Sequence, residues 1–405
     1  MNQRADHNGD TSQPESARLT LGRMGPVGDT LAAFEGREIQ VFGGIPGEEV
    51  EARIVRNRRR RKRLVSAVVT DVLRPSPHRI APPCPLFGPC TGCQWQHIDY
   101  SHQLRLKRQN VEDELRRYAS LEAVDVPPTV PSPDTFNYRN HARLMVRQRG
   151  TLGFVNRTTL RFVAVNDCKI MDPWINDAIA SLQGNSQETT QMSIRYGVGT
   201  GDWLIQPTMH SVDIPLASGQ THYRERLLDR TFRVASPSFF QVNTRQTEQM
   251  VELVRSRLQL SGDELLVDAF AGVGTFSVLL APYVRRVIAI EESVAAVRDA
   301  TVNGAGIEGL ELVEAKTEDV LMTLPETPDA LILDPPRSGC HPDVLKAIVD
   351  RPPGRIAYVS CEPETLARDL DVLVRGGLVL ESVEPIDMFP QTYHVECVAT
   401  LSGTA

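Results

Sequence analysis

The 405-residue sequence has no long hydrophobic run and few aromatic residues, which make up 6% of the chain. No apolar stretch approaches the ~20 residues that a membrane-spanning helix needs, so we expect no transmembrane segment and no membrane partner. The N-terminal residues 1–20 are polar and lack the apolar core of a secretory signal. The seven cysteines are few and odd in number, which favours reduced thiols with chemical or metal-binding roles. These absences together predict a cytoplasmic protein.

Charge is unevenly distributed along the chain. The net charge is -7, yet residues 51–170 contain 22 Lys and Arg against 10 Asp and Glu. The densest basic run covers residues 53–63, where eight of eleven residues are basic. A cationic region joined to an acidic remainder indicates a surface for a polyanion such as RNA. A solvated charged hairpin is the alternative explanation of the basic run.

Hydrophobic patterning divides the chain into four segments. Residues 1–17 are polar and are expected to form a disordered tail. Residues 18–75 contain short alternating runs punctuated by Gly and Pro, which predicts an OB-like β-barrel of about five strands. Residues 76–235 have an irregular α+β character. Residues 236–405 alternate strands and helices, which predicts a mostly parallel, Rossmann-like α/β sheet.

Individual elements can be placed within these segments. A helix is expected over 101–118, with Leu104, Val111 and Leu115 on one face and Lys107 among the surrounding basic residues. The strands expected in the last segment are 265–267, 287–290, 330–333, 356–360 and 394–401.

A glycine-containing loop, residues 267–275, follows the first of these strands. Its glycines permit a tight turn and let a ligand approach the backbone at the carboxyl ends of the strands. Glu291 ends the next strand, where a carboxylate can accept the hydroxyl protons of a ribose. Ser277 stands where a dinucleotide fingerprint has its third glycine, and the acidic Asp268 precedes the two glycines of the loop; both favour S-adenosylmethionine over NAD. A glycine turn in another α/β fold is the alternative.

Three further motifs are expected at strand ends. Asp334 opens an Asp-Pro-Pro-Arg loop similar to the one that base-modifying methyltransferases place beside the methyl donor. Cys361 follows the next strand, in a position suited to a nucleophile. Glu396 lies on a late strand, where alternation places His394 on the same face. Simple packing of the cysteine and an edge charge at the glutamate are the alternatives.

These residue types match the needs of uracil methylation. Carbon 5 of uracil is too weak a nucleophile to take a methyl group directly. A thiolate that adds at carbon 6 produces an enolate whose carbon 5 can attack a sulfonium methyl. A general base must then remove the proton from carbon 5, so nucleophile, methyl donor and base are all required.

As a set, the motifs resemble those of the RNA (uracil-5-)methyltransferases over nearly the whole chain. They are SPSFFQVN at 236–243, the glycine loop, DPPR at 334–337, SCEP at 360–363 and HVE at 394–396. The resemblance implies that Cys361 is the nucleophile and Glu396 the base. The residues that it implies around S-adenosylmethionine are Gln241, Phe270, Thr275, Glu291 and Asp334. Residues 18–75 look like the TRAM domain of this family, an RNA-binding module.

Four cysteines form a second candidate site. Cys84, Cys90 and Cys93 are closely spaced, and Cys168 lies about 75 residues further on. Four thiolates suit a [4Fe–4S] cluster or zinc, and the family resemblance implies [4Fe–4S]. Nearby aromatic and basic residues suit single-stranded RNA. Zinc and unligated thiols remain the alternatives.

The target is expected to be a folded RNA. A barrel, a cluster and a catalytic domain together look most like the bacterial enzymes acting on 23S ribosomal RNA, with transfer RNA as the alternative. A catalytically inactive RNA-binding or ribosome-assembly factor is a rival function, and so is an adenine or guanine amino-methyltransferase. Arg337 stands where RNA cytosine-5 methyltransferases have a second cysteine, which disfavours cytosine. No obligate protein partner is evident, and we expect a monomer.

Overall fold

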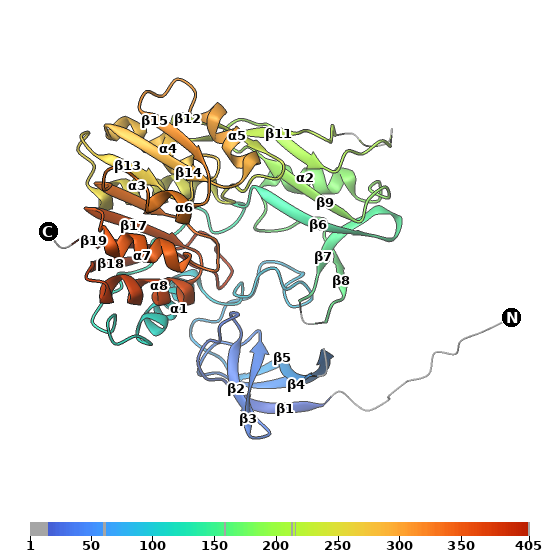
Figure 1. Cartoon of the computed structure of the whole chain (residues 1–405). Coiled ribbons are helices and arrows are strands. Elements are labelled where there is room, and N and C mark those ends of the chain that lie inside the picture. Colours follow the sequence, from blue (N-terminus) through green and yellow to red (C-terminus); the bar gives the residue numbers. More distant parts are fainter. Residues whose placement is uncertain (1–14, 60–61, 158, 212–213, 215, 404–405) are drawn as a thin grey trace. The chain divides into compact units, whose positions relative to one another are not determined.

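The computed structural model describes residues 15–59, 62–157, 159–211, 214 and 216–403 (Figure 1). The chain forms two compact units, one of Met1–Gly88 with Cys93–Asp99 and the other of Pro89–Gly92 with Tyr100–Ala405. Residues 1–14 of the predicted tail lie outside the described residues. None of the helices in the described ranges has both the length and the apolar character that crossing a membrane requires.

The first unit is built on a five-stranded sheet. Its strands are β1 (Ser16–Thr20), β2 (Thr30–Phe34), β3 (Arg37–Phe42), β4 (Glu49–Arg59) and β5 (Lys62–Arg74), in the order β1-β4-β5-β3-β2. Ile39, Val41 and Val50 are among the apolar residues that fill its core. About five strands were predicted here, and five are present, while closure into a barrel and the TRAM assignment remain predictions.

A second five-stranded sheet lies in the region that the sequence suggested was irregular. Its strands are β6 (His141–Arg147), β7 (Thr151–Val155), β8 (Phe162–Ala164), β9 (Gln191–Tyr196) and β10 (Trp203–Gln206), in the order β10-β9-β6-β7-β8. Alternate residues of β6, such as Leu144, are buried against helix α2 (Pro173–Leu182). A hairpin of β11 (His222–Leu227) and β12 (Arg230–Ala235) follows. The region thus has the α+β character that was expected, and it is more regular than the sequence suggested.

The last part of the chain forms a seven-stranded sheet in the order β15-β14-β13-β16-β17-β19-β18. Its strands are β13 (Leu265–Asp268), β14 (Arg286–Glu291), β15 (Leu310–Glu314), β16 (Ala330–Leu333), β17 (Arg355–Ser360), β18 (Val379–Ile386) and β19 (Glu396–Ser402). β13 to β17 pair in parallel, whereas β19 is antiparallel to both β17 and β18. The predicted mostly parallel α/β sheet is confirmed.

Helices cover both faces of this sheet. They are α1 (Tyr100–Leu115), α3 (Thr244–Leu258), α4 (Thr275–Leu280), α5 (Val294–Asn303), α6 (Thr317–Leu321), α7 (Pro342–Asp350) and α8 (Pro363–Arg375). One core contains residues of α1, α7 and α8, and the other contains residues of α3 and α4. α1 lies beside α8 although the two are far apart in sequence (Figure 1). Because strands of the sheet contribute alternate residues to the two cores, the apolar runs in the sequence are nearly continuous.

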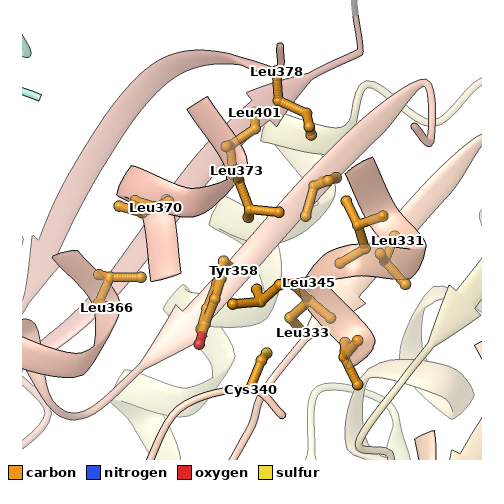
Figure 2. Close-up of a cluster of buried hydrophobic side chains, with 14 of the residues drawn as sticks. Leu331, Leu333, Cys340, Leu345, Tyr358, Leu366, Leu370, Leu373, Leu378 and Leu401 are labelled. Atoms are coloured by element: carbon orange, nitrogen blue, oxygen red, sulfur yellow. The ribbon is translucent and has the colours of Figure 1, made fainter. Parts of the chain in front are cut away.

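The core on the α8 side surrounds a buried tyrosine. Leu366, Leu370 and Leu373 of α8 lie around Tyr358 of β17 (Figure 2). The Tyr358 hydroxyl donates a hydrogen bond to Asp369 Oδ2 at 2.6 Å, so its one polar atom is satisfied within the core. This core supports the strands whose ends carry the predicted site.

The last strand begins later than predicted. β19 starts at Glu396, and His394 lies in the preceding loop, so alternation along one strand does not relate these two residues. Pro390 and Gln391, which has a left-handed φ of 69°, interrupt extended structure just upstream. The strand thus begins two residues later than the expected 394–401.

Candidate active site

The predicted site residues lie at one edge of the seven-stranded sheet. Each ends or directly follows a parallel strand, except for Glu396, which begins the antiparallel β19. The carboxyl ends of parallel strands and the amino end of an antiparallel neighbour meet at the same edge. The residues concerned are Asp268 of β13, Glu291 of β14, Asp334 after β16, Cys361 after β17 and Glu396.

The glycine loop is a tight turn closed by Glu291. Gly272 and Gly274 have positive φ angles of 55° and 87°, a conformation that favours glycine. The Gly272 amide donates to Glu291 Oε2 at 2.9 Å, and the Ser293 amide donates to Glu291 Oε1 at 2.7 Å. Each carboxylate oxygen has a second lone pair, so Glu291 retains capacity to accept hydroxyl protons.

Asp268 lies beneath this loop and is completely buried. The Ser277 amide donates to its Oδ2 at 3.0 Å, and the Ser277 hydroxyl donates to the same atom. Its Oδ1 has no hydrogen-bond partner among the described residues. Burial raises the pKa of Asp268 to about 6, and the Glu291 carboxylate adds to the rise.

Two further carboxyl groups, those of Asp334 and Glu396, lie at the same edge of the sheet as Asp268 and Glu291. We call these four the row of carboxyl groups. Burial raises the pKa of Asp334 to about 7, and the negative charge of Asp268 contributes to that rise. Glu396 is 3% exposed, and its pKa lies well above the usual range because of burial and the nearby Asp334, while Arg337 opposes the shift. Buried carboxyl groups that repel one another are stabilised by a cation, so this row suits a positively charged ligand.

Cys361 is half-buried beside Glu396 and Arg337. Burial raises the pKa of its thiol to about 11, and the Glu396 and Asp334 carboxyl groups act in the same direction. The nearby Arg337 guanidinium opposes this rise in pKa. A thiolate formed at Cys361 would therefore be favoured by the positive charge of Arg337.

Helix α8 holds the loop that carries Arg337. The Thr365 hydroxyl donates to the Arg337 carbonyl at 3.1 Å, and Arg368 Nη2 donates to the Ser338 carbonyl at 2.8 Å. Gly339 has a φ of 78°, and a side chain there would meet Arg368 and Asp369. These contacts fix the Asp-Pro-Pro-Arg loop against the N-terminus of the helix that follows Cys361.

The other predicted cofactor residues lie on neighbouring segments. Gln241 is 9% exposed and precedes α3, and its carbonyl accepts a hydrogen bond from Asn140 Nδ2 at 3.2 Å. Phe270 is half-buried in the turn after β13 and packs against the core on the α8 side. Thr275 is the first residue of α4, directly after the glycine loop. Phe270 and Thr275 follow β13 and so lie at the edge of the sheet at which the carboxyl groups lie.

Known proteins are similar to this chain in sequence and in fold. The tRNA (Uracil-5-)-methyltransferase family model matches residues 220–328 and 327–403. The chain is 33% identical to an RNA methyltransferase of Synechocystis, over 96% of both chains. It is 31% identical to an RNA methyltransferase of Listeria monocytogenes, over 95% of this chain and 96% of that one. The chain belongs to the RNA (uracil-5-)methyltransferase family.

A solved structure of the family agrees with this assignment. The fold is similar to the crystal structure of Pyrococcus abyssi tRNA (uracil-54, C5)-methyltransferase in complex with S-adenosyl-L-homocysteine, with a TM-score of 0.70 and 27% identity. The match covers 95% of this chain and 100% of the Pyrococcus chain. The predictions that the chain is an enzyme and an RNA methyltransferase are confirmed.

The structure does not support the predicted iron–sulfur site of this family member. Cys84 and Cys93 belong to the first compact unit, whereas Cys90 and Cys168 belong to the second. Thiolates are suitable ligands for such a cluster, but no group of three or more Cys, His, Asp or Glu side chains in the described ranges is arranged to hold a metal ion. The cluster therefore remains a prediction from the sequence.

Two residues have a larger role at the site than the sequence indicated. Arg337 was considered only as a residue that replaces a cysteine, although its place directly after Asp-Pro-Pro puts it beside the next strand end. Asp268 was considered only as a marker of the loop type, whereas its Oδ1 is buried without a hydrogen-bond partner among the described residues and its charge helps to raise the pKa of Asp334.

Proposed function

We propose that this chain transfers the methyl group of S-adenosylmethionine to carbon 5 of a uridine in RNA. The observation that carries the proposal is the convergence of a thiol, a cationic partner for it and a buried carboxyl group at one sheet edge, at Cys361, Arg337 and Glu396. Uracil methylation needs such a nucleophile and base beside a methyl donor.

The methyl donor would bind over the glycine loop. Glu291 is suited to the ribose hydroxyls, and the Asp334 and Asp268 carboxylates complement the positive sulfonium. We propose Gln241, Phe270 and Thr275 as further contacts of the cofactor, as the family resemblance implies. The Pyrococcus relative, whose structure contains S-adenosyl-L-homocysteine, supports a cofactor of this type.

The first chemical step would be addition of the Cys361 thiolate to carbon 6 of the uracil. The new carbon–sulfur bond places the electron pair of the carbon 5–carbon 6 double bond in an enolate. Carbon 5 then attacks the sulfonium methyl, and the carbon–sulfur bond of the cofactor breaks to give a neutral thioether. Arg337 stabilises the thiolate before addition.

Glu396 would complete the reaction. As a carboxylate it accepts the proton of carbon 5, and the electron pair of that bond restores the carbon 5–carbon 6 double bond. The thiolate of Cys361 leaves carbon 6 in the same elimination. The raised pKa of Glu396 makes its carboxylate a stronger base than an exposed glutamate.

The RNA target is proposed as 23S ribosomal RNA. The basic run at 53–63 and the sheet of the first unit support RNA binding through a TRAM-like module, with segment boundaries at 18–75, 76–235 and 236–405. Transfer RNA is the second candidate, because the Pyrococcus relative is a tRNA (uracil-54, C5)-methyltransferase. We propose a monomer in both cases.

The [4Fe–4S] cluster is kept as a separate proposal. It rests on the spacing of Cys84, Cys90, Cys93 and Cys168 and on the family resemblance. Anaerobically purified protein should contain four iron and four sulfide per chain by chemical analysis, in keeping with the cluster formula. Stoichiometric zinc without iron would overturn it, and no step of the reaction depends on it.

Methyl transfer to defined RNAs tests the proposed function. Purified protein with radiolabelled S-adenosylmethionine should label ribosomal RNA from cells that lack this protein, and nucleoside analysis should identify 5-methyluridine. Transfer RNA from the same cells is the parallel substrate that separates the two targets. Label in N6-methyladenosine or in a methylated guanosine, or no label in either RNA, would refute the proposal.

A further inference from the structure

The first two turns of α1 direct three polar side chains into the protein, those of Tyr100, Gln103 and Lys107. Gln103 and Lys107 are 1% and 0% exposed. Val111 and Leu115 continue the same row, four residues apart, into the apolar core. A fully buried lysine is rare in proteins unless it is paired, so its partners indicate what this part of the helix does.

Lys107 and Gln103 hold the loop that connects β18 to β19. Lys107 Nζ donates to Asp387 Oδ1 at 2.5 Å and to the Phe389 carbonyl at 3.1 Å. Gln103 Nε2 donates to Gln391 Oε1, and the Gln391 amide donates to Gln103 Oε1, both at 3.0 Å. We call this set of contacts between α1 and residues 387–391 the polar latch.

Two tyrosines add further contacts around the loop. The Tyr100 hydroxyl accepts a hydrogen bond from the Ser132 amide at 2.8 Å and interacts with Asp387. The Tyr138 hydroxyl donates to the Pro390 carbonyl at 3.0 Å. This loop leads directly into Glu396, the first residue of β19.

The latch extends almost to the catalytic base. Phe389, whose carbonyl accepts a hydrogen bond from Lys107, also contacts His394. The centroids of the two rings lie 5.9 Å apart in an edge-on arrangement. His394 is two residues before Glu396, the first residue of β19. A buried ion pair is often no more stabilising than apolar residues of similar volume, but it does fix one geometry. The latch is therefore better suited to orienting the loop than to adding stability.

We propose that the polar latch positions Glu396 for proton abstraction and that Lys107 is a positioning residue of the reaction. This inference rests on the proposed function, in which Glu396 acts only after methyl transfer. Misplacement of a catalytic group by about 1 Å can slow its step about 100-fold. Loosening the latch should then slow elimination while leaving thiol addition and methyl transfer largely intact.

The test is accumulation of the methylated adduct on ordinary RNA. With uridine RNA and S-adenosylmethionine, Lys107→Met should form a protein–RNA band that survives a denaturing gel, as Glu396→Gln should, whereas wild type should show little. Turnover to 5-methyluridine should fall about 10-fold to 100-fold. A structural role alone predicts a loss of turnover with no more adduct than wild type forms.

Two further variants keep the test decisive. Gln103→Met removes two hydrogen bonds of the latch without leaving a buried charge, and it should also accumulate adduct if Lys107→Met is insoluble. Val111→Ala, in the same helical row, should lower thermal stability without accumulating adduct. The proposal is overturned if both latch variants keep wild-type turnover, or if they lose turnover without accumulating adduct.

A separate substrate distinguishes failure of this inference from failure of the proposed function. In 5-fluorouridine RNA, carbon 5 carries fluorine in place of the hydrogen that the base must remove as a proton. Wild type should therefore be trapped on this RNA as the covalent adduct. If wild type is not trapped, the mechanism itself is wrong. If wild type is trapped on this RNA, but the latch variants accumulate no more adduct on ordinary uridine RNA than Val111→Ala does, only the role of the latch is wrong.

Discussion

Cys361 and Glu396 lie directly beyond the last residue pair of the β17–β19 ladder, in which Ser360 is paired with Cys397. Side chains of directly opposed residues on antiparallel strands are close neighbours. The proposed nucleophile and base therefore take their separation from a hydrogen-bonded ladder. Arg337 and Asp334 reach the same place from the end of β16, on the other side of β17.

Removing the thiol of Cys361 should abolish product formation. Cys361→Ala is expected to reduce 5-methyluridine synthesis by more than about 1000-fold, because carbon 5 then has no route to activation. The measurement is methyl transfer to RNA from cells lacking this protein. Cys340→Ala, at a buried cysteine in the core, is the matched control and should remain active. Full activity of Cys361→Ala would favour the amino-methyltransferase alternative.

The reactivity of Cys361 should depend steeply on pH. Because its thiol pKa is raised to about 11, the thiolate fraction should rise about tenfold per pH unit across the neutral range. Alkylation of Cys361 by iodoacetamide, followed by mass spectrometry of its peptide, should show no plateau below about pH 9.

The same measurement tests Arg337. Arg337→Met removes the positive charge next to the thiol, which raises the thiol pKa further and should slow alkylation about 3-fold to 10-fold at a given pH. Arg375→Met, at an exposed arginine of α8, is the control and should have no effect. Equal alkylation rates in the two variants would argue against a role for Arg337 at the thiol.

Binding of S-adenosylmethionine should strengthen as pH rises from about 5 to about 8. Asp268 and Asp334 have raised pKa values of about 6 and about 7, so they lose their protons in this interval and become partners for the sulfonium. S-adenosylhomocysteine has no sulfonium charge and should show a weaker dependence. Calorimetric titration of both ligands at each pH gives the comparison.

Asp334→Asn should flatten the pH dependence for S-adenosylmethionine. Asp350→Asn, at an exposed residue of α7, keeps the chain's other charges and should leave the dependence unchanged. Identical slopes for the two ligands with wild-type protein would show that the row of carboxyl groups does not recognise the sulfonium.

Replacing Glu396 should stabilise the free protein. A carboxyl group whose folded-state pKa is raised favours folding while it is protonated, and that contribution is lost as pH rises through the folded pKa. Glu396→Gln removes the ionisation, so its advantage over wild type should grow from about pH 6 to about pH 8. At the higher pH we expect the free energy of unfolding, measured in urea, to be about 0.5–2 kcal/mol larger for Glu396→Gln than for wild type. Equal stability of the two proteins at both pH values would contradict this reasoning.

Much of the catalytic edge could be predicted because its signals are local. A β-branched run followed by a motif places a residue at a strand end, and parallel strands bring their ends together without further information. Asp334 and Cys361 were placed at strand ends in this way. His394 was misplaced because the turn at Pro390 and Gln391 depends on contacts with α1, which is distant in sequence.

Lys107 shows what local patterns miss. It was expected among the basic residues around an apolar face, whereas it is fully buried. Its spacing of four and eight residues from Val111 and Leu115 was a signal that it belongs to the buried row. The charge of Lys107 nevertheless favoured an exposed position, because the sequence does not show that Asp387, 280 residues away in the chain, is its partner. The sheet of β6 to β10 was missed although β6 alternates, since its strands are short and lie between long loops.

The antiparallel placement of β19 also bears on how the enzyme should fail. A slip of one residue between β17 and β19 would turn Glu396 toward the opposite side of the sheet and carry it away from the sulfur. Small losses of packing elsewhere leave that ladder intact, because its strands are buried within the seven-stranded sheet. On heating, formation of the thiol adduct should therefore persist until the sheet itself melts, and then vanish within the same narrow interval of temperature.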